Sequence, residues 1–232
     1  MPNLIPSALV AAGTLSSLTL AFVFTRRYRQ WARARFIQDY TFPSAVRQKV
    51  WQKYNHLNDA QLDKVMSALR VWFQLNQTAG GRFLSMPSQA VDVAWHEFIL
   101  FTRNYETFCQ KSLGRFLHHT PAEAMTRPMQ AQDGIKRCWH LSCQRERINK
   151  AKPHRLPLLF GIDKELGIAD GFFYSTNCSA LGNNEYCATH IGSCGSGTSC
   201  GSSGWDGNSS DASGDSGSSC GSSCGSGCGG GD

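Results

Sequence analysis

The sequence lacks the short motifs that identify the common enzyme classes. It contains no phosphate-binding glycine loop, no nucleophile elbow and no acid pair at a catalytic spacing. His96 and Glu97 are adjacent, but a zinc-protease helix needs a second histidine one turn after His96, where this chain has Leu100. These absences exclude the P-loop, α/β-hydrolase and zinc-protease classes, and we expect a protein that is not an enzyme.

Positive charge is absent from the C-terminal part of the chain. All 23 Lys and Arg residues lie at or before Lys164, whereas every charge after Glu185 is an aspartate. The body is therefore basic and the tail is acidic. A basic body fits nucleic acid, anionic lipid or simple solubility.

Charge of either sign is absent between Leu4 and Phe24. A helix of about 21 residues is about 31 Å long, which matches a bilayer core of about 30 Å. Five arginines and no acid follow between Thr25 and Arg35. By the positive-inside rule, this flank places the body in the cytoplasm.

The sequence therefore predicts a transmembrane anchor over residues 1–25 and a basic juxtamembrane segment over residues 26–42. The membrane is the expected partner, in a single-pass protein of the cell membrane whose C-terminal domain is cytoplasmic. We expect no nucleic-acid partner, because the arginines lie at the predicted membrane surface. The competing interpretation is a buried apolar helix of a soluble domain.

Strand-like alternation is absent from residues 43–188, where apolar residues repeat at three and four positions instead. Asn58 and Gly80 bound the clearest helical segment. Thr120 opens a capping box with Glu123. Further helices are expected over residues 43–54, 87–114, 129–148 and 158–166. The predicted fold class is all-α, with one N-terminal transmembrane helix, a compact helical domain over residues 43–188 and a tail.

Apolar residues are nearly absent from the predicted tail, residues 189–232, which is mostly Gly, Ser and Cys. Such a segment cannot offset the entropy lost on ordering, so we expect it to be disordered. Cys220, Cys224 and Cys228 recur every four residues and, as reduced cytoplasmic thiols, can gather thiophilic metal ions. The alternatives are a flexible extension with incidental thiols and a precursor whose Cys and Ser residues become heterocycles.

His96, Cys109, His118 and His119 are the candidate metal ligands of the body. On one continuous helix, His96 and Cys109 would lie about 20 Å apart. A helix break at residues 101–103 would let them converge, and a thiolate with imidazoles suits zinc or another thiophilic metal. The competing interpretation places His96 at the edge of the core and Cys109 as a small buried residue. It places the pair His118 and His119 in a surface turn.

The block from Val91 to His119 resembles the glycine-rich domain-containing protein family. The resemblance is carried by Asp92, Trp95, His96, Tyr105, Cys109, Gly114 and His119. It extends over roughly residues 40–180, and bacterial members of that family also carry a Gly/Cys-rich tail. The resemblance implies no established activity, but it singles out His96, Cys109 and His119.

We therefore expect a membrane-anchored, non-enzymatic interaction or scaffold protein with an unidentified protein partner and a thiol-rich tail that can bind metal. One alternative is a metal-dependent enzyme centred on His96, Cys109 and His119. Another is the precursor of a peptide tail that is modified at Cys and Ser.

Overall fold

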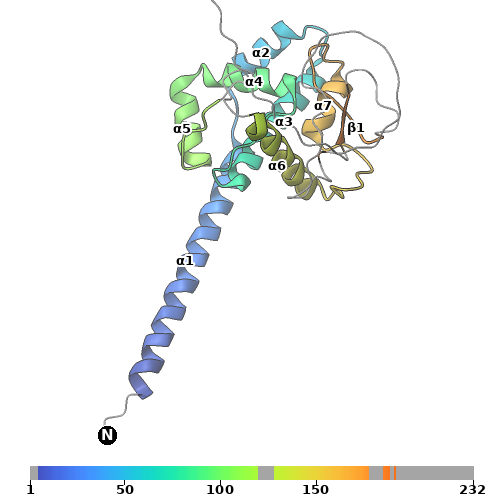
Figure 1. The fold of residues 1–232 in the computed structure, drawn as a ribbon. Helices are drawn as coiled ribbons and strands as arrows, with labels where there is room; N and C mark the ends of the chain where they lie inside the picture. The colour runs from blue at the N-terminus through green and yellow to red at the C-terminus, as the bar shows by residue number, and fades with distance from the viewer. Residues whose placement is uncertain (1–4, 120–127, 178–184, 189–190, 192–232) are drawn as a thin grey trace, which may run out of the picture. The chain divides into compact units, whose positions relative to one another are not determined.

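The computed structural model describes residues 5–119, 128–177, 185–188 and 191 (Figure 1). These residues belong to one compact unit that runs from Met1 to Thr198. Within them the chain forms seven α-helices and two short strands. In chain order the elements are α1 (Ile5–Asp39), α2 (Ser44–Lys53), α3 (Asp59–Ala79), α4 (Gln89–Ile99), α5 (Thr102–Ser112), α6 (Pro128–Glu146), α7 (Leu158–Leu166), β1 (Phe173–Ser175) and β2 (Glu185–Cys187).

The C-terminal part of α1 packs on the helical domain. Arg70 of α3 donates to the carbonyl of Ile37 at 3.2 Å and to that of Tyr40 at 2.9 Å. Gln77, also on α3, donates to the carbonyl of Gln30 at 2.7 Å. Large apolar side chains earlier in the helix are exposed, namely Leu18, Leu20, Phe22 and Phe24. The contacts to α3 therefore hold only the last turns of α1.

The predicted transmembrane anchor is wrong. Residues 5–39 form one helix, but no helix in the described part of the chain combines the length and the apolarity that a membrane crossing requires. The uncharged stretch is diluted by glycine, serine and threonine between Ser7 and Thr19, and the rest of α1 carries arginines. The single-pass topology, the membrane partner and the cell-membrane localisation with a cytoplasmic domain all rested on that span, and they are wrong with it.

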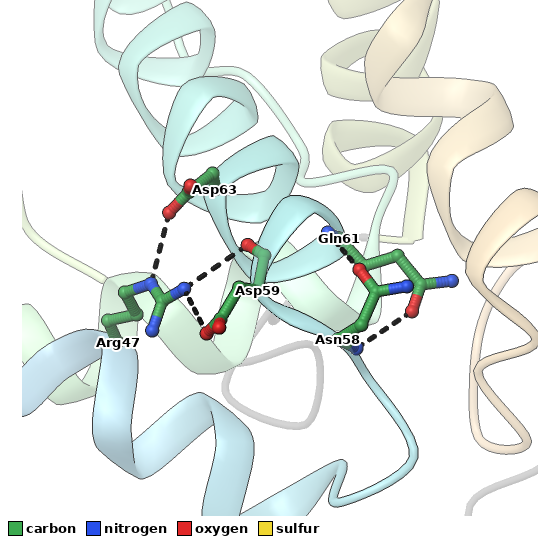
Figure 2. Close-up of polar contacts among 5 residues, drawn as sticks. All are labelled: Arg47, Asn58, Asp59, Gln61 and Asp63. Carbon is green, nitrogen blue, oxygen red and sulfur yellow. Dashed lines mark hydrogen bonds and ion pairs between the residues drawn. The ribbon is translucent and has the colours of Figure 1, made fainter.

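Polar side chains hold the turn between α2 and α3 (Figure 2). Asn58 caps α3, because its side chain accepts from the Gln61 backbone N–H at 2.9 Å while the Gln61 side chain accepts from the Asn58 N–H at 2.9 Å. Arg47 of α2 pairs with Asp59 at 2.7 Å and with Asp63 at 3.0 Å. The predicted start of this helix at Asn58 is confirmed.

An aromatic cluster fills the space between α3, α4 and α5. The ring of Phe108 on α5 lies edge-on to Phe73 of α3 at 4.6 Å and to Phe98 of α4 at 5.3 Å between centroids. The single helix expected over residues 87–114 is wrong, because α4 ends at Ile99 and α5 begins at Thr102, next to the place considered for a break. The break lets α5 turn its own apolar face onto the cluster.

The last helices lead into a two-stranded parallel sheet. α7 ends at Leu166, and the following residue, Gly167, has a φ of 64°, the left-handed conformation that glycine adopts readily. β1 pairs with β2 so that Tyr174 lies opposite Tyr186. The expected all-α class with a membrane anchor is therefore wrong. The helical domain is present, but it carries this strand pair, and its described helices include no membrane span.

Several predictions fall on residues outside the described ranges. They are the capping box at Thr120 and the tail from Gly192 onward, with Cys220, Cys224 and Cys228. The predicted domain boundaries after residues 25, 42 and 188 stay predictions.

Candidate functional site

One face of α4 carries two residues of the candidate site. Asp92 and His96 are four residues apart, so their side chains lie one above the other on the helix. Asp92 Oδ2 and His96 Nδ1 are 3.3 Å apart. The side chain of Asp92 is 20% exposed and that of His96 is 49% exposed. The pair therefore lies at the edge of the core, within reach of solvent.

His119 brings a third donor from a different part of the chain. It lies in the segment after α5, and its Nε2 atom is 3.2 Å from Asp92 Oδ1. The rings of His119 and His96 are 4.0 Å apart, and the Trp95 ring meets His119 edge-on at 4.7 Å. Only 15% of the His119 side chain is exposed, so its neighbours restrict its orientation.

The three side chains form a donor set that suits a transition-metal ion. One ligand atom from each of Asp92, His96 and His119 lies within 4.8 Å of the others. Zinc takes imidazole and carboxylate donors at roughly 2.0–2.2 Å, and tetrahedral donors at such bond lengths stand roughly 3.3–3.5 Å apart. Asp92 is 3.2 Å from His119 through Oδ1 and 3.3 Å from His96 through Oδ2. A single ion would bind one carboxylate oxygen and both imidazoles within the 4.8 Å span. The residues therefore fit a mononuclear site.

The same distances also fit a cluster held by hydrogen bonds alone. In that state, the imidazole nitrogen of His96 or His119 that faces Asp92 carries a proton and donates it to a carboxylate oxygen. A bound metal ion would replace those protons on the same nitrogens. The two states differ in composition, so a metal-binding measurement separates them.

Cys109 lies apart from this group, although its sequence position made it a candidate ligand. Its side chain is fully buried on α5. Burial raises the pKa of the Cys109 thiol, and hydrogen bonds with the Leu117 backbone and the Tyr105 side chain only partly oppose this. A protonated thiol in the core is a poor metal ligand, since the thiolate is the form that binds. The structure brings His96 and His119 together, whereas Cys109 lies in the core and is not part of the group.

Asp92 is the ligand candidate that sequence reasoning missed. A signal for it was present, because Asp92 and His96 are four residues apart in a segment predicted to be helical. Metal-binding helices use this spacing to bring two ligands together. The buried residues of α4 are Ala90, Val91, Ala94, Trp95 and Phe98. Asp92 and His96 are not among them, so the pair falls away from the centre of the core.

A second carboxylate, that of Asp163 on α7, holds the N-terminal end of α4. It accepts from the Ser88 hydroxyl at 2.6 Å and from the backbone N–H groups of Gln89 at 2.7 Å, Ala90 at 3.2 Å and Phe172 at 3.0 Å. Asp163 is 1% exposed, and its negative charge lies at the positive end of the helix dipole. It therefore fixes the start of the helix that carries the candidate site.

The comparison with protein families corrects the predicted resemblance. The chain matches the model of the UCP032817-like family over residues 32–193, so the assignment to the glycine-rich domain-containing family is wrong. No curated protein and no solved structure matches the chain. The matched range begins in α1, includes Asp92, His96 and His119, and ends beyond β2. Because the match covers more than half of the 232 residues, the chain belongs to the UCP032817-like family.

Proposed function

We propose that the protein is a non-enzymatic metal-binding protein that holds one zinc ion on Asp92, His96 and His119. The observation that carries the proposal is the convergence of these three side chains within 4.8 Å, from α4 and from the segment after α5. An ion at this position would join the two segments, much as structural metals stabilise small domains. This role suits an interaction protein, in which the ion keeps a surface in one conformation.

The residues between the two helical ligands favour binding over catalysis. Zinc-protease helices with ligands four residues apart carry a glutamate at the second or the fourth position of the motif. Between Asp92 and His96 these positions hold Val93 and Trp95, and neither side chain can take up a proton. Glu97 is rotated by about 100° from His96 around the helix. Helix α4 therefore supplies ligands without a general base beside them.

Zinc binding by the full chain, measured by competition with a chromogenic chelator, tests the proposal. Asp92→Asn, His96→Ala and His119→Ala should each lower the affinity at this site by more than about 100-fold, since losing a supporting group alone costs about 10–100-fold. His118→Ala is the matched control. That imidazole is adjacent in sequence, but it is exposed and its ring lies 4.8 Å from Phe116.

Cobalt(II) in place of zinc separates this site from the cysteine-rich tail. Thiolate ligands give cobalt a charge-transfer absorption that imidazole and carboxylate ligands do not give. The proposal requires a cobalt spectrum without thiolate character that disappears in His119→Ala and persists in His118→Ala. The same stoichiometry and spectrum in the wild type and all three ligand variants would overturn it.

A metal-dependent enzyme on the same three residues is the second candidate. The number of ligands favours it, because structural zinc sites have four protein ligands and catalytic sites have three with one open position. Hydrolysis of an activated ester by the zinc-loaded full chain would support this function if His119→Ala loses it and His118→Ala keeps it. Equal rates in these two variants would reject it.

A further inference from the structure

Three buried residues link α4 to the segment that carries His119. The Trp95 Nε1 atom lies 3.0 Å from the Tyr105 hydroxyl oxygen. That oxygen lies 2.6 Å from the carbonyl oxygen of Leu117. Trp95, Tyr105 and Leu117 are 5%, 1% and 8% exposed, so water does not compete freely for these bonds.

The chemistry of the groups fixes the direction of these two bonds, and the Cys109 thiol lies beside the same hydroxyl and the Leu117 backbone. An indole N–H can only donate, so the Tyr105 oxygen accepts from Trp95. The Tyr105 proton is then directed to the Leu117 carbonyl, which can only accept. Burial raises the pKa of Tyr105 well above its usual range, so the hydroxyl keeps this proton at neutral pH.

Both ends of the chain of bonds act on His119. Leu117 stands two residues before His119, so the bond from Tyr105 fixes the backbone that leads into it. Trp95 touches His119 directly, through the edge-on contact of their rings at 4.7 Å. Tyr105 therefore restrains the segment before His119 and the ring beside it at the same time.

We infer that Tyr105 is a positioning residue of the proposed metal site, which holds His119 in the orientation of a ligand through the Leu117 carbonyl and the Trp95 indole. The inference rests on the proposed function, because it names what pre-organises that site. Tyr105 does not contact the ion. Groups that support metal ligands in this way typically account for about 10–100-fold in metal affinity.

The test is the zinc affinity of full-length Tyr105→Phe, which keeps the ring and loses the hydroxyl. The affinity should fall by about 10–100-fold, and the cobalt spectrum should change because His119 is no longer held. Ser112→Ala is the matched control. Its buried hydroxyl also lies on α5 and donates to a backbone carbonyl, that of Phe108, at 2.6 Å. It makes no bond to the segment before His119, so zinc affinity should match the wild type.

The outcomes separate this inference from the proposed function. Wild-type affinity and an unchanged cobalt spectrum in Tyr105→Phe overturn the inference, while the metal site stands if His119→Ala still loses the ion. A wild type that binds no zinc outside its tail thiols overturns the proposed function instead. If Tyr105→Phe does not fold, Trp95→Phe takes its place, because it removes the N–H that orients the Tyr105 hydroxyl. Unchanged affinity in that variant overturns the inference as well.

Discussion

The carboxylates of Asp163 and Asp92 both lie at the N-terminal part of α4, but they differ in exposure and in the groups that they contact. Asp163, at the N-terminal end of α4, is 1% exposed and accepts hydrogen bonds from the Ser88 hydroxyl and three backbone N–H groups. Asp92, within the first turn of α4, has a side chain that is 20% exposed and meets two imidazoles. The fold saturates the Asp163 carboxylate with hydrogen-bond donors, whereas the Asp92 carboxylate faces two imidazoles that could instead bind a metal ion.

The difference lies in what the donors can release. Backbone N–H groups and the Ser88 hydroxyl keep their protons at physiological pH, so a cation cannot displace them from Asp163. Imidazole nitrogens exchange a proton for a metal ion under the same conditions. Asp163 is therefore suited to holding the fold together, whereas Asp92 is suited to reversible binding.

The largest expected effect on stability is that of Asp163→Asn. This substitution keeps the shape of the side chain but turns one acceptor oxygen into an amide group that faces N–H donors. At least one buried donor loses its partner, and the negative charge at the start of α4 is lost. We expect the free energy of unfolding, measured by urea denaturation of the full chain, to fall by about 3 kcal/mol or more.

Asp92→Asn makes the same chemical change on the exposed side of the same helix. We expect it to lower the free energy of unfolding by less than about 1 kcal/mol, because partly exposed ion pairs contribute little. It should lower the zinc affinity by more than about 100-fold, whereas Asp163→Asn should keep the wild-type zinc affinity as long as it is folded. Equal losses of stability in Asp92→Asn and Asp163→Asn would contradict the view that only Asp163 is needed to hold the fold together.

Much of the helical structure could be predicted because helix ends have local signals. Asn58 and Gly80 mark the ends of α3, and the apolar run from Leu158 to Leu166 is α7 with the same bounds. The role of α1 could not be predicted in this way. An uncharged run fits a bilayer or a protein surface, and the packing of its last turns depends on distant residues such as Arg70. The strands are three residues long, too short to show an alternating pattern.

The candidate site could be predicted only in part, for a similar reason. Spacing gave four candidates, and the family resemblance narrowed them to His96, Cys109 and His119. The structure places Asp92, not Cys109, beside the two histidines. The choice depends on how α5 is rotated about its own axis after the break that follows α4. Packing of Phe108 against the aromatic cluster sets that rotation and turns Cys109 into the core. Spacing along the chain does not encode a rotation fixed by side chains of other helices.

The buried thiols of Cys138 and Cys143 in α6 make the stability of the interior depend on pH in the alkaline range. Burial raises the pKa of Cys138 to about 12 and that of Cys143 to about 11, from an ordinary value of 9.0. Above pH 9 the unfolded chain loses these protons while the folded chain keeps them. Their contribution to stability is therefore complete below pH 9 and is lost as the pH rises. We expect the free energy of unfolding to fall by about 1 kcal/mol for each thiol between about pH 9 and 10.

A double variant, Cys138→Ala with Cys143→Ala, is the control for this pH dependence. Urea denaturation over the same pH range should give a shallower decrease, with the remainder contributed by groups such as Cys109, whose pKa burial also raises. A decrease as steep as in the wild type would contradict the assignment to α6.

The turn between α2 and α3 contains the substitution with the smallest expected effect, and a capping residue beside it for comparison (Figure 2). Asp63→Ala should lower the free energy of unfolding by at most about 0.5 kcal/mol, because Asp63 is 71% exposed and Arg47 retains Asp59. Asn58→Ala should cost about 1 kcal/mol, since it leaves the Gln61 backbone N–H without its cap. Parallel urea denaturation measures both. The comparison of Asp163 with Asp92 implies that capping a backbone N–H contributes more to stability than an exposed ion pair. A larger loss from Asp63→Ala than from Asn58→Ala would contradict it.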